Sequence, residues 1–418
     1  MYIIPGYTNY YEKNGAIFVS SSLFQNEVKL TDPIVQTEFR SIVKSRGCKE
    51  LTTPLSKFLH EQELIANETE IKLALARVKE LLEETLLLTI MPTEGCNFRC
   101  PYCYENHNPI SMTRQVLDAI QAYISKQASK YKSLQINWFG GEPTLCRDTI
   151  LETSQLVQSL QTQYHFQYAS NMTTNGYLLN TDYFKQFYNS GITTYQITLD
   201  GWNHDKTRPL ASGKGTLQTI LSNLVSLATL PRDEYQFYII IRHNILPSDE
   251  DFSWYDYLYN LFGNDDRFSV LIRPVGDWGG ESVHSLNVLT GPDRDYLTLK
   301  HIEYLKKIGM QCENGAKGLF SKICCASYPH SMVFRSNGKI EKCTVALDHP
   351  LNQLGYIDSN NEIILNDEIN KLWSLTQIKA ECHTCPDILS CLNMQCQKAR
   401  IIDNRSDNSC SQVLSTIY

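Results

Sequence analysis

The sequence has no block of basic residues and no long hydrophobic run, and both absences narrow its function. Its 418 residues carry a net charge of −7 at neutral pH, so nothing in the charge pattern favours a nucleic-acid partner. No apolar stretch approaches the roughly 18 residues of a membrane span, so no membrane partner is expected. The first residues also lack the basic and apolar regions of a signal peptide. We therefore expect a protein that works in the cytoplasm.

The cysteine content is high for such a protein. Hydrophobic residues at 42% and charged residues at 20% are typical of a globular chain of two or three domains. Fourteen cysteines without a secretion signal favour metal or cluster ligation over disulfides. Nine of them lie between Cys312 and Cys410, and three lie close together near residue 100. The remaining two, Cys48 and Cys146, are expected to be buried thiols.

The three clustered cysteines, Cys96, Cys100 and Cys103, have the spacing C-x3-C-x2-C, with Tyr102 just before the last. A cubane iron–sulfur cluster normally takes four cysteine ligands. A loop that supplies three leaves one iron open, as an open position marks a catalytic zinc site. The alternative interpretation is a zinc site or a cysteine-rich turn.

This loop, including Tyr102, resembles that of the radical S-adenosylmethionine (SAM) enzymes. The resemblance implies a [4Fe-4S] cluster whose open iron chelates SAM. It also implies a flavodoxin or ferredoxin-like reducing partner. The reduced cluster would cleave SAM to a 5′-deoxyadenosyl radical that abstracts a substrate hydrogen, while the protein binds and orients both.

The segment from residue 86 to residue 309 alternates short apolar runs with amphipathic helical stretches. Six runs that look like strands begin at Leu86, Leu134, Tyr168, Thr194, Tyr235 and Phe268. Six βα units predict a parallel sheet, either a partial barrel or a doubly wound sheet. The resemblance implies the partial (β/α)6 barrel of an α/β protein. It also implies that the cysteine loop lies at the carboxyl end of the first strand, where barrel folds place their chemistry.

Two further motifs resemble the SAM-binding segments of the same family. The first is Gly140-Gly141-Glu142-Pro143, which follows the second strand and corresponds to the family's motif for the amino group of SAM. The second is Thr198 together with Arg208, whose guanidinium suits a carboxylate. Without the resemblance, these residues would be a turn, a helix cap and a surface ion pair.

Residues 1–85 have a different pattern. Two strand candidates are separated by the turn sequence Asn14-Gly15, and three helical stretches follow. This arrangement resembles a divergent winged-helix module, which in peptide-modifying radical SAM enzymes recognises a leader peptide. A simple cap on the barrel is the alternative.

Residues 310–418 contain the remaining cysteine pattern. Cys325 is followed by Gly338 and Cys343 with spacings of twelve and four residues, and a second group ends at Cys410. The pattern resembles the SPASM extension of peptide maturases, although the interval before Cys396 is four residues where that family has three. The resemblance implies two auxiliary clusters, hence three [4Fe-4S] clusters in all. One would be bound by Cys382, Cys385, Cys391 and Cys410.

The other auxiliary cluster would be bound by Cys325, Cys343 and Cys396. Its fourth ligand is open between Cys312, Cys324 and a substrate thiolate. A zinc ribbon is the alternative for this tail.

The combined resemblance implies an enzyme that modifies a ribosomally made precursor peptide, with a leader and a cysteine-containing core. The stretch from Arg273 to Gly280 is similar to that of sactipeptide and ranthipeptide maturases, which form a thioether between a cysteine sulfur and a carbon. An anaerobic sulfatase-type maturase, which makes formylglycine, is one alternative. A non-catalytic iron–sulfur electron carrier or peptide-binding protein is another. The sequence identifies no catalytic acid or base.

Overall fold

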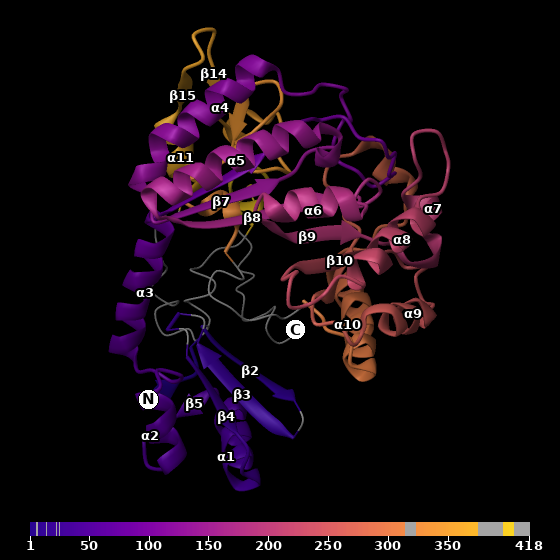
Figure 1. The fold of residues 1–418 in the computed structure, drawn as a ribbon. Coiled ribbons are helices and arrows are strands. Elements are labelled where there is room, and N and C mark those ends of the chain that lie inside the picture. The colour runs from indigo at the N-terminus through magenta and orange to yellow at the C-terminus, as the bar shows by residue number, and fades with distance from the viewer. Residues whose placement is uncertain are drawn as a thin grey trace. The chain divides into compact units, whose positions relative to one another are not determined.

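The computed structural model describes the chain apart from residues 6, 14, 22, 25, 314–322, 375–395 and 405–418. Its described residues form two compact units (Figure 1). Among the described residues, the first comprises 1–83, 323–329, 371–374 and 396–404, and the second comprises 84–313 and 330–370. Each unit is described by itself.

The first unit begins with small antiparallel sheets. Strands β2 (Thr8–Lys13), β3 (Ala16–Ser21) and β4 (Glu27–Leu30) form a meander, and β1 (Tyr2–Ile3) pairs with β5 (Gly47–Cys48). The β2–β3 connection contains Gly15 at φ 73°, a left-handed conformation that glycine adopts without strain. The hairpin therefore turns where the Asn14-Gly15 sequence predicts it.

Three helices complete the N-terminal part of this unit. Asp32 caps α1 (Pro33–Lys44) and Thr53 caps α2 (Pro54–Glu61), each accepting hydrogen bonds from backbone amides of the first turn. The third is α3 (Glu68–Glu83). Buried Val19, Phe39 and Leu59 join the sheet to α1 and α2 in one hydrophobic core. The small helix α13 (Gln397–Ile401) also lies in this unit.

The second unit contains six consecutive βα units. Its parallel strands are β6 (Thr85–Ile90), β7 (Ser133–Trp138), β8 (Gln167–Thr174), β9 (Ile192–Thr198), β10 (Tyr238–Ile245) and β11 (Phe268–Pro274). Its helices are α4 (Arg114–Gln127), α5 (Arg147–Tyr164), α6 (Thr181–Asn189), α7 (His204–Thr207), α8 (Leu217–Ala228), α9 (Ser253–Phe262) and α10 (Gly291–Ile308).

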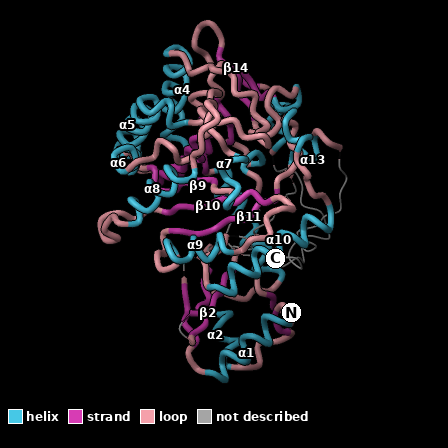
Figure 2. The backbone as a smooth tube through the Cα atoms, turned by 90° about the vertical axis from the view of Figure 1, so that its right-hand side faces the viewer, coloured by secondary structure: helices cyan, strands magenta, loops and turns pink. Residues whose placement is uncertain are grey.

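From β7 to β11, each strand pairs with its predecessor in the chain, so the order runs from β6 to β11 without a reversal. Figure 2 shows β9, β10 and β11 side by side. A doubly wound sheet reverses its strand order, so that alternative is excluded. Because parallel crossovers are right-handed, this order places the helices on one face, as α4, α5 and α6 show in Figure 1. An α/β fold with a mostly parallel sheet is confirmed.

The sheet continues beyond the six units. Strand β12 (Ser331–Phe334) lies parallel to β6 on its far side, and β13 (Lys339–Glu341), β14 (Gln353–Ile357) and β15 (Ile363–Leu365) follow antiparallel. Helix α11 (Asp367–Trp373) follows β15. Strand β6 has a partner on both edges, and all six of its side chains, which point alternately to the two faces of the sheet, are buried.

Strand β10 begins three residues later than the apolar run predicts. The amide of Tyr235 donates to the carbonyl of Pro231, and that of Gln236 donates to the Tyr188 hydroxyl. These amides are therefore unavailable to a sheet, although Phe237 still packs in the core.

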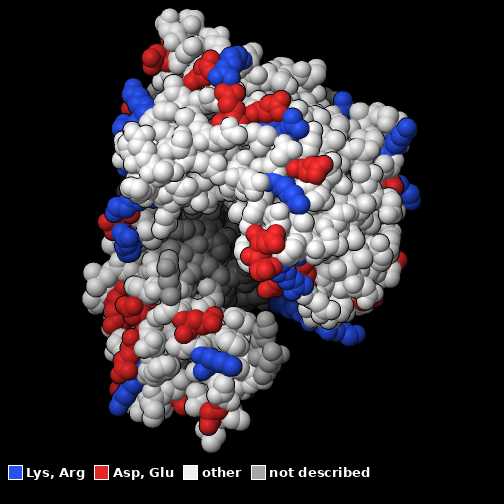
Figure 3. Space-filling model, viewed as in Figure 1, with Lys and Arg blue, Asp and Glu red and all other residues white. Residues whose placement is uncertain are grey.

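Basic and acidic side chains are interspersed on the face drawn in Figure 3, where the described residues form no broad basic field. Among the described residues, no helix is both long and apolar enough to cross a membrane.

Candidate functional site

The loop with the three cysteines leaves the carboxyl end of β6. Its residue Phe98 is buried and forms an isolated bridge with Leu210. The amide of Arg99 donates to the carbonyl of Pro209, and the amide of Ala211 donates to that of Asn97, at 2.9 and 2.7 Å. Backbone pairing with the segment after α7 therefore fixes this loop before any cofactor is considered.

The thiols of Cys96, Cys100 and Cys103 are half-buried on one loop and interact with one another electrostatically. Burial raises the pKa of Cys96 to about 12 and that of Cys103 to about 12, and it raises the pKa of Cys100 as well. These thiols are protonated at neutral pH until a metal displaces the protons. Among the described residues, no three His, Cys, Asp or Glu side chains lie close enough together to bind one metal ion. Three adjacent cysteines with one iron per thiolate suit a cluster instead.

The glycine pair after β7 packs directly against the backbone of the cysteine loop. A Cβ at Gly140 would lie 2.3 Å from the carbonyl oxygen of Thr93, and one at Gly141 would lie 2.3 Å from that of Gly95. The Glu142 amide donates to the same Gly95 carbonyl at 2.9 Å. The glycines therefore let two chain segments approach more closely than any side chain would permit.

Glu142 is fully buried and its carboxylate accepts four hydrogen bonds. The donors are the amide and hydroxyl of Thr144, the hydroxyl of Thr174 at 2.6 Å, and the amide of Asn175 at 2.7 Å. Burial raises its pKa, which these hydrogen bonds oppose. Its carboxylate thus connects the ends of β7 and β8. Asn175 continues the connection, since its amide group donates to the Asn97 side chain at 2.7 Å.

Tyr102 lies at the centre of a polar network formed by the ends of β9 and β10. Its hydroxyl donates to Asp200 and accepts hydrogen bonds from Arg208 at 2.8 Å and Asn244 at 3.1 Å. The other oxygen of Asp200 accepts from the Asn244 amide at 3.1 Å. Carboxyl ends of parallel strands meet at one edge of a sheet, which is why residues so far apart in sequence converge here.

Arg208 has unused hydrogen-bonding capacity. Its side chain is 9% exposed, and its Nε is buried without a hydrogen-bond partner among the described residues. Burial alone would lower its pKa, but Cys100, Tyr102 and Asp200 raise it well above the usual value. A permanently charged guanidinium with a buried, unsatisfied N–H group is costly unless an acceptor binds it. This residue could therefore bind an anionic group of a ligand. Thr198 is buried nearby, opposite Arg242 in the pairing of β9 and β10.

Three buried aromatic side chains are linked by hydrogen bonds next to this strand edge. The hydroxyl of Tyr255 contacts His243 Nδ1 at 2.8 Å and His301 Nδ1 at 2.5 Å, and both histidines are at most 3% exposed. Burial lowers the pKa of each to about 3, so both rings are neutral at physiological pH. His243 also packs against Gly201, the residue that follows Asp200.

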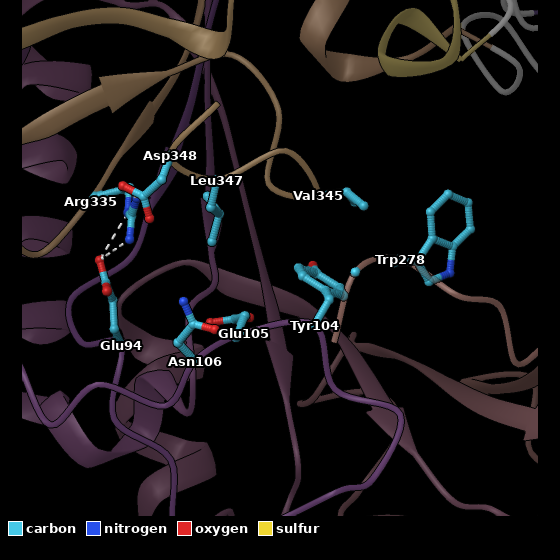
Figure 4. Close-up of a pocket in the computed structure, with 10 residues that line it drawn as sticks. Glu94, Tyr104, Glu105, Asn106, Trp278, Arg335, Val345, Leu347 and Asp348 are labelled. Carbon is cyan, nitrogen blue, oxygen red and sulfur yellow. Dashed lines mark hydrogen bonds and ion pairs between the residues drawn. The ribbon is translucent and has the colours of Figure 1, made fainter. Parts of the chain in front are cut away.

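A cavity of about 240 Å³ lies beside the cysteine loop (Figure 4). The segment after Cys103 lines one part of it, the 278–279 loop another, and the segment around β12 and β13 the rest. A Cβ at Gly280 would lie 2.2 Å from the Cys103 carbonyl oxygen, so the loop bearing Trp278 packs against the cysteine loop.

The tail cysteines divide between the two units. Cys312 and Cys343 belong to the second unit, and Cys324, Cys325 and Cys396 belong to the first. Cys382, Cys385, Cys391 and Cys410 lie outside the described residues. The two auxiliary clusters therefore stay a prediction.

Three residues of the candidate site were not identified from the sequence. Asp200 and Asn244 organise the network around Tyr102, and Glu105 lines the cavity. Polar residues at the ends of β9 and β10 were the available signal for the first two. Glu105 had only its position two residues after Cys103.

Comparison with known proteins identifies the central region. Residues 90–244 match the model of the Radical SAM superfamily. The GTP 3′,8-cyclase of Campylobacter jejuni subsp. doylei is 30% identical over 144 residues, covering 33% of this chain and 41% of that protein. An S-adenosylmethionine-dependent nucleotide dehydratase of Pseudoalteromonas ulvae is 28% identical over 113 residues, covering 23% and 35%. The chain thus spans about two fifths or less of the length of these curated relatives.

Solved structures are similar over more of the chain. Native anSMEcpe with bound AdoMet and Cp18Cys peptide has a TM-score of 0.51 at 18% identity, covering 73% of this chain and 88% of that one. Streptococcus suis SuiB bound to precursor peptide SuiA has a TM-score of 0.50 at 14% identity, covering 94% of both chains. At such identities the likeness shows a shared fold.

Proposed function

We propose that this chain, which contains a radical SAM domain at residues 90–244, modifies a ribosomally made precursor peptide. The observation that carries the SAM-dependent part is Arg208. Its guanidinium is buried against Tyr102, beside the three-cysteine loop, with Nε unsatisfied. A carboxylate ligand at this position would relieve that cost.

Each site residue then has a defined part. Cys96, Cys100 and Cys103 would hold a [4Fe-4S] cluster, and Arg208 would bind the SAM carboxylate. Asp200 and Asn244 hold the Tyr102 hydroxyl, which in turn orients Arg208. Gly140, Gly141 and Glu142 seat the cysteine loop, and the glycine backbone would face the SAM amino group. Cluster and SAM together supply the 5′-deoxyadenosyl radical.

The peptide substrate is supported by fold. The likeness to peptide-bound SuiB extends over 94% of the chain and so includes the N-terminal unit. We propose that residues 1–85, as a winged-helix-like module, recognise the leader. The barrel of residues 86–309 would act on a cysteine-containing core, with electrons from a flavodoxin or ferredoxin-like protein in the cytoplasm.

The proposed product is a thioether between a cysteine sulfur and an acceptor carbon. Forming this bond removes one hydrogen atom from carbon, one proton from the thiol and one electron. The hydrogen atom ends in 5′-deoxyadenosine and the proton in solvent. The electron needs an acceptor, for which we propose the two further [4Fe-4S] clusters of a SPASM domain at residues 310–418.

Mass spectrometry of an anaerobic reaction tests this proposal. The protein is incubated with SAM, dithionite and a short cysteine-containing candidate peptide. We expect 5′-deoxyadenosine and a peptide that has lost two hydrogen masses and no longer reacts with iodoacetamide. An aldehyde at the cysteine would instead support formylglycine formation and overturn the thioether. Absence of 5′-deoxyadenosine would refute enzymatic SAM cleavage.

The control variant replaces Cys96, Cys100 and Cys103 together with alanine. It should lose SAM cleavage while keeping the iron of any tail clusters. Cleavage that persists in this variant would place the SAM-binding cluster elsewhere in the chain.

A further inference from the structure

The cavity beside the cysteine loop contains a carboxylate that forms no ion pair with a cation among the described residues. Three carboxylates line it, from Glu94, Glu105 and Asp348, against the single guanidinium of Arg335. The distribution of hydrogen bonds among these four groups determines what the cavity can bind.

Arg335 is committed to the other acids. It is 3% exposed, and its Nε and Nη2 donate to Glu94 at 2.9 and 2.8 Å. Its Nη1 lies 2.8 Å from Asp348 and 3.3 Å from buried Glu341. Asp348 also pairs with Lys339 at 2.6 Å. Glu94 and Asp348 therefore each form an ion pair within the protein.

Glu105 is the remaining acid. Its Oε2 is buried and has no hydrogen-bond partner among the described residues. Figure 4 shows Glu105 between the Glu94–Arg335–Asp348 group on one side and Tyr104 and Trp278 on the other. A buried carboxylate oxygen without a donor is costly, so a ligand that brings a donor gains the full benefit of the new hydrogen bond.

Aromatic residues provide the other recognition element. Trp278 and Tyr104 both line the cavity, and Trp278 is 48% exposed. A cation near the face of an indole ring is attracted by the ring's electrons. At about 240 Å³ the cavity is smaller than the roughly 300–1,000 Å³ typical of sites for whole ligands, so it suits one extended side chain rather than a nucleotide.

We propose that this cavity binds a lysine or arginine side chain of the peptide substrate, with Glu105 as its counter-ion and Trp278 as its aromatic wall. This inference rests on the proposed peptide-modifying function. Because Gly280 and Tyr104 adjoin Cys103, a side chain held here anchors the peptide next to the cysteine loop. The cavity therefore selects cores with a basic residue close to the modified position.

Small probes test this binding without turnover. N-acetyl-lysine amide and N-acetyl-arginine amide are titrated calorimetrically into the reconstituted full chain, with uncharged N-acetyl-norleucine amide as comparison. Both cationic probes should bind, and norleucine amide should not. E105Q, which keeps the shape of the side chain, should weaken binding by roughly 10- to 100-fold. Trp278→Leu should weaken it by roughly 2- to 5-fold.

Asp266→Asn is the matched control. Asp266 is exposed and precedes β11 at the opposite end of that strand from the cavity, so this variant removes one negative charge elsewhere. It should bind the probes as the unchanged protein does. Iron content and circular dichroism verify that E105Q is folded.

The outcomes separate this inference from the proposed function. Equal binding by E105Q, or binding of norleucine amide as tight as that of lysine amide, overturns the cationic pocket even if SAM is cleaved. Cation binding that depends on Glu105 in a protein that forms no 5′-deoxyadenosine supports the pocket and refutes the proposed function.

Discussion

Replacing Gly141 with alanine tests whether a glycine is needed here for the segment after β7 to approach the cysteine loop. Gly141 has no positive φ, so alanine brings no backbone strain of its own. Its new Cβ would, however, lie 2.3 Å from the Gly95 carbonyl oxygen and 2.6 Å from that of Glu94. Both obstacles are backbone atoms, so no side-chain rotation relieves the clash.

The expected cost has two parts. Overpacking of this kind costs about 1–3 kcal/mol. Separating the segments also lengthens the 2.9 Å hydrogen bond from the Glu142 amide to Gly95, which contributes about 0.5–1.5 kcal/mol. The sum is about 1.5–4.5 kcal/mol, which lowers Tm by roughly 3–8 °C for a unit of this size. The same displacement moves Cys96, the next residue.

Thermal unfolding of the metal-free protein and iron content after anaerobic reconstitution are the measurements. Gly95→Ala is the matched control in the same loop, since its nearest obstacle is the Thr93 hydroxyl at 3.2 Å. We expect this control to retain iron and stability, and Gly141→Ala to lose much of both. Equal iron content and Tm in the two variants would show that the close approach of Gly141 has no role in holding the loop.

Three further predictions follow from the same region. Arg208→Lys keeps the charge but loses the planar fork, so equilibrium dialysis should show SAM affinity reduced roughly 10- to 100-fold; unchanged affinity would contradict carboxylate binding. Glu142→Gln replaces a carboxylate that accepts four hydrogen bonds with an amide that has one donor group, so urea unfolding without SAM should show a free energy of unfolding lower by about 1–3 kcal/mol. If this variant instead keeps its full stability and loses SAM binding, Glu142 is a direct ligand of SAM. The folded-state pKa of about 3 at His243 and at His301 lies below the 6.5 of an unfolded chain, so below pH 6.5 the unfolded state binds more protons. The contribution of these two histidines to the free energy of unfolding should thus be complete above pH 6.5. It should fall as the pH drops towards 3, by up to about 1.4 kcal/mol for each pH unit and each histidine. His301→Phe should make this slope shallower, and an unchanged slope in urea unfolding from pH 7 to 5 would refute the neutral, buried state of His301.

The βα pattern was predictable because each strand of the second unit is a short apolar run followed by an amphipathic helix. Strands β6, β7 and β11 begin within one residue of the predicted positions. The addition of β12 beside β6 was not predictable, since its four residues come after a long intervening segment and carry no periodic signal.

The residues that meet at the candidate site were predictable from their spacing and the family resemblance, as for Cys96 and Arg208, and their ligand roles stay predictions. The roles of Glu142 and Gly141 were not, because a fully bonded carboxylate and a backbone contact depend on which segments meet in three dimensions. Glu105 was missed for the same reason. Its place in the cavity depends on the ion pairs that Arg335 forms with Glu94 and Asp348, and Arg335 lies more than 200 positions after Glu105 in the sequence.

The pairing of β6 with β12 has a consequence for synthesis of the chain. Ile90 lies opposite Phe334, so the edge of β6 that pairs with β12 has no partner until a segment about 240 residues later in the chain has been synthesised. At roughly 5–20 residues per second, that edge stays open for roughly 12–50 s on the ribosome. An apolar strand with an open edge is a template for pairing with other chains. The nascent protein is therefore most prone to aggregate in this interval, and a chaperone that covers β6 would act before residue 334 emerges.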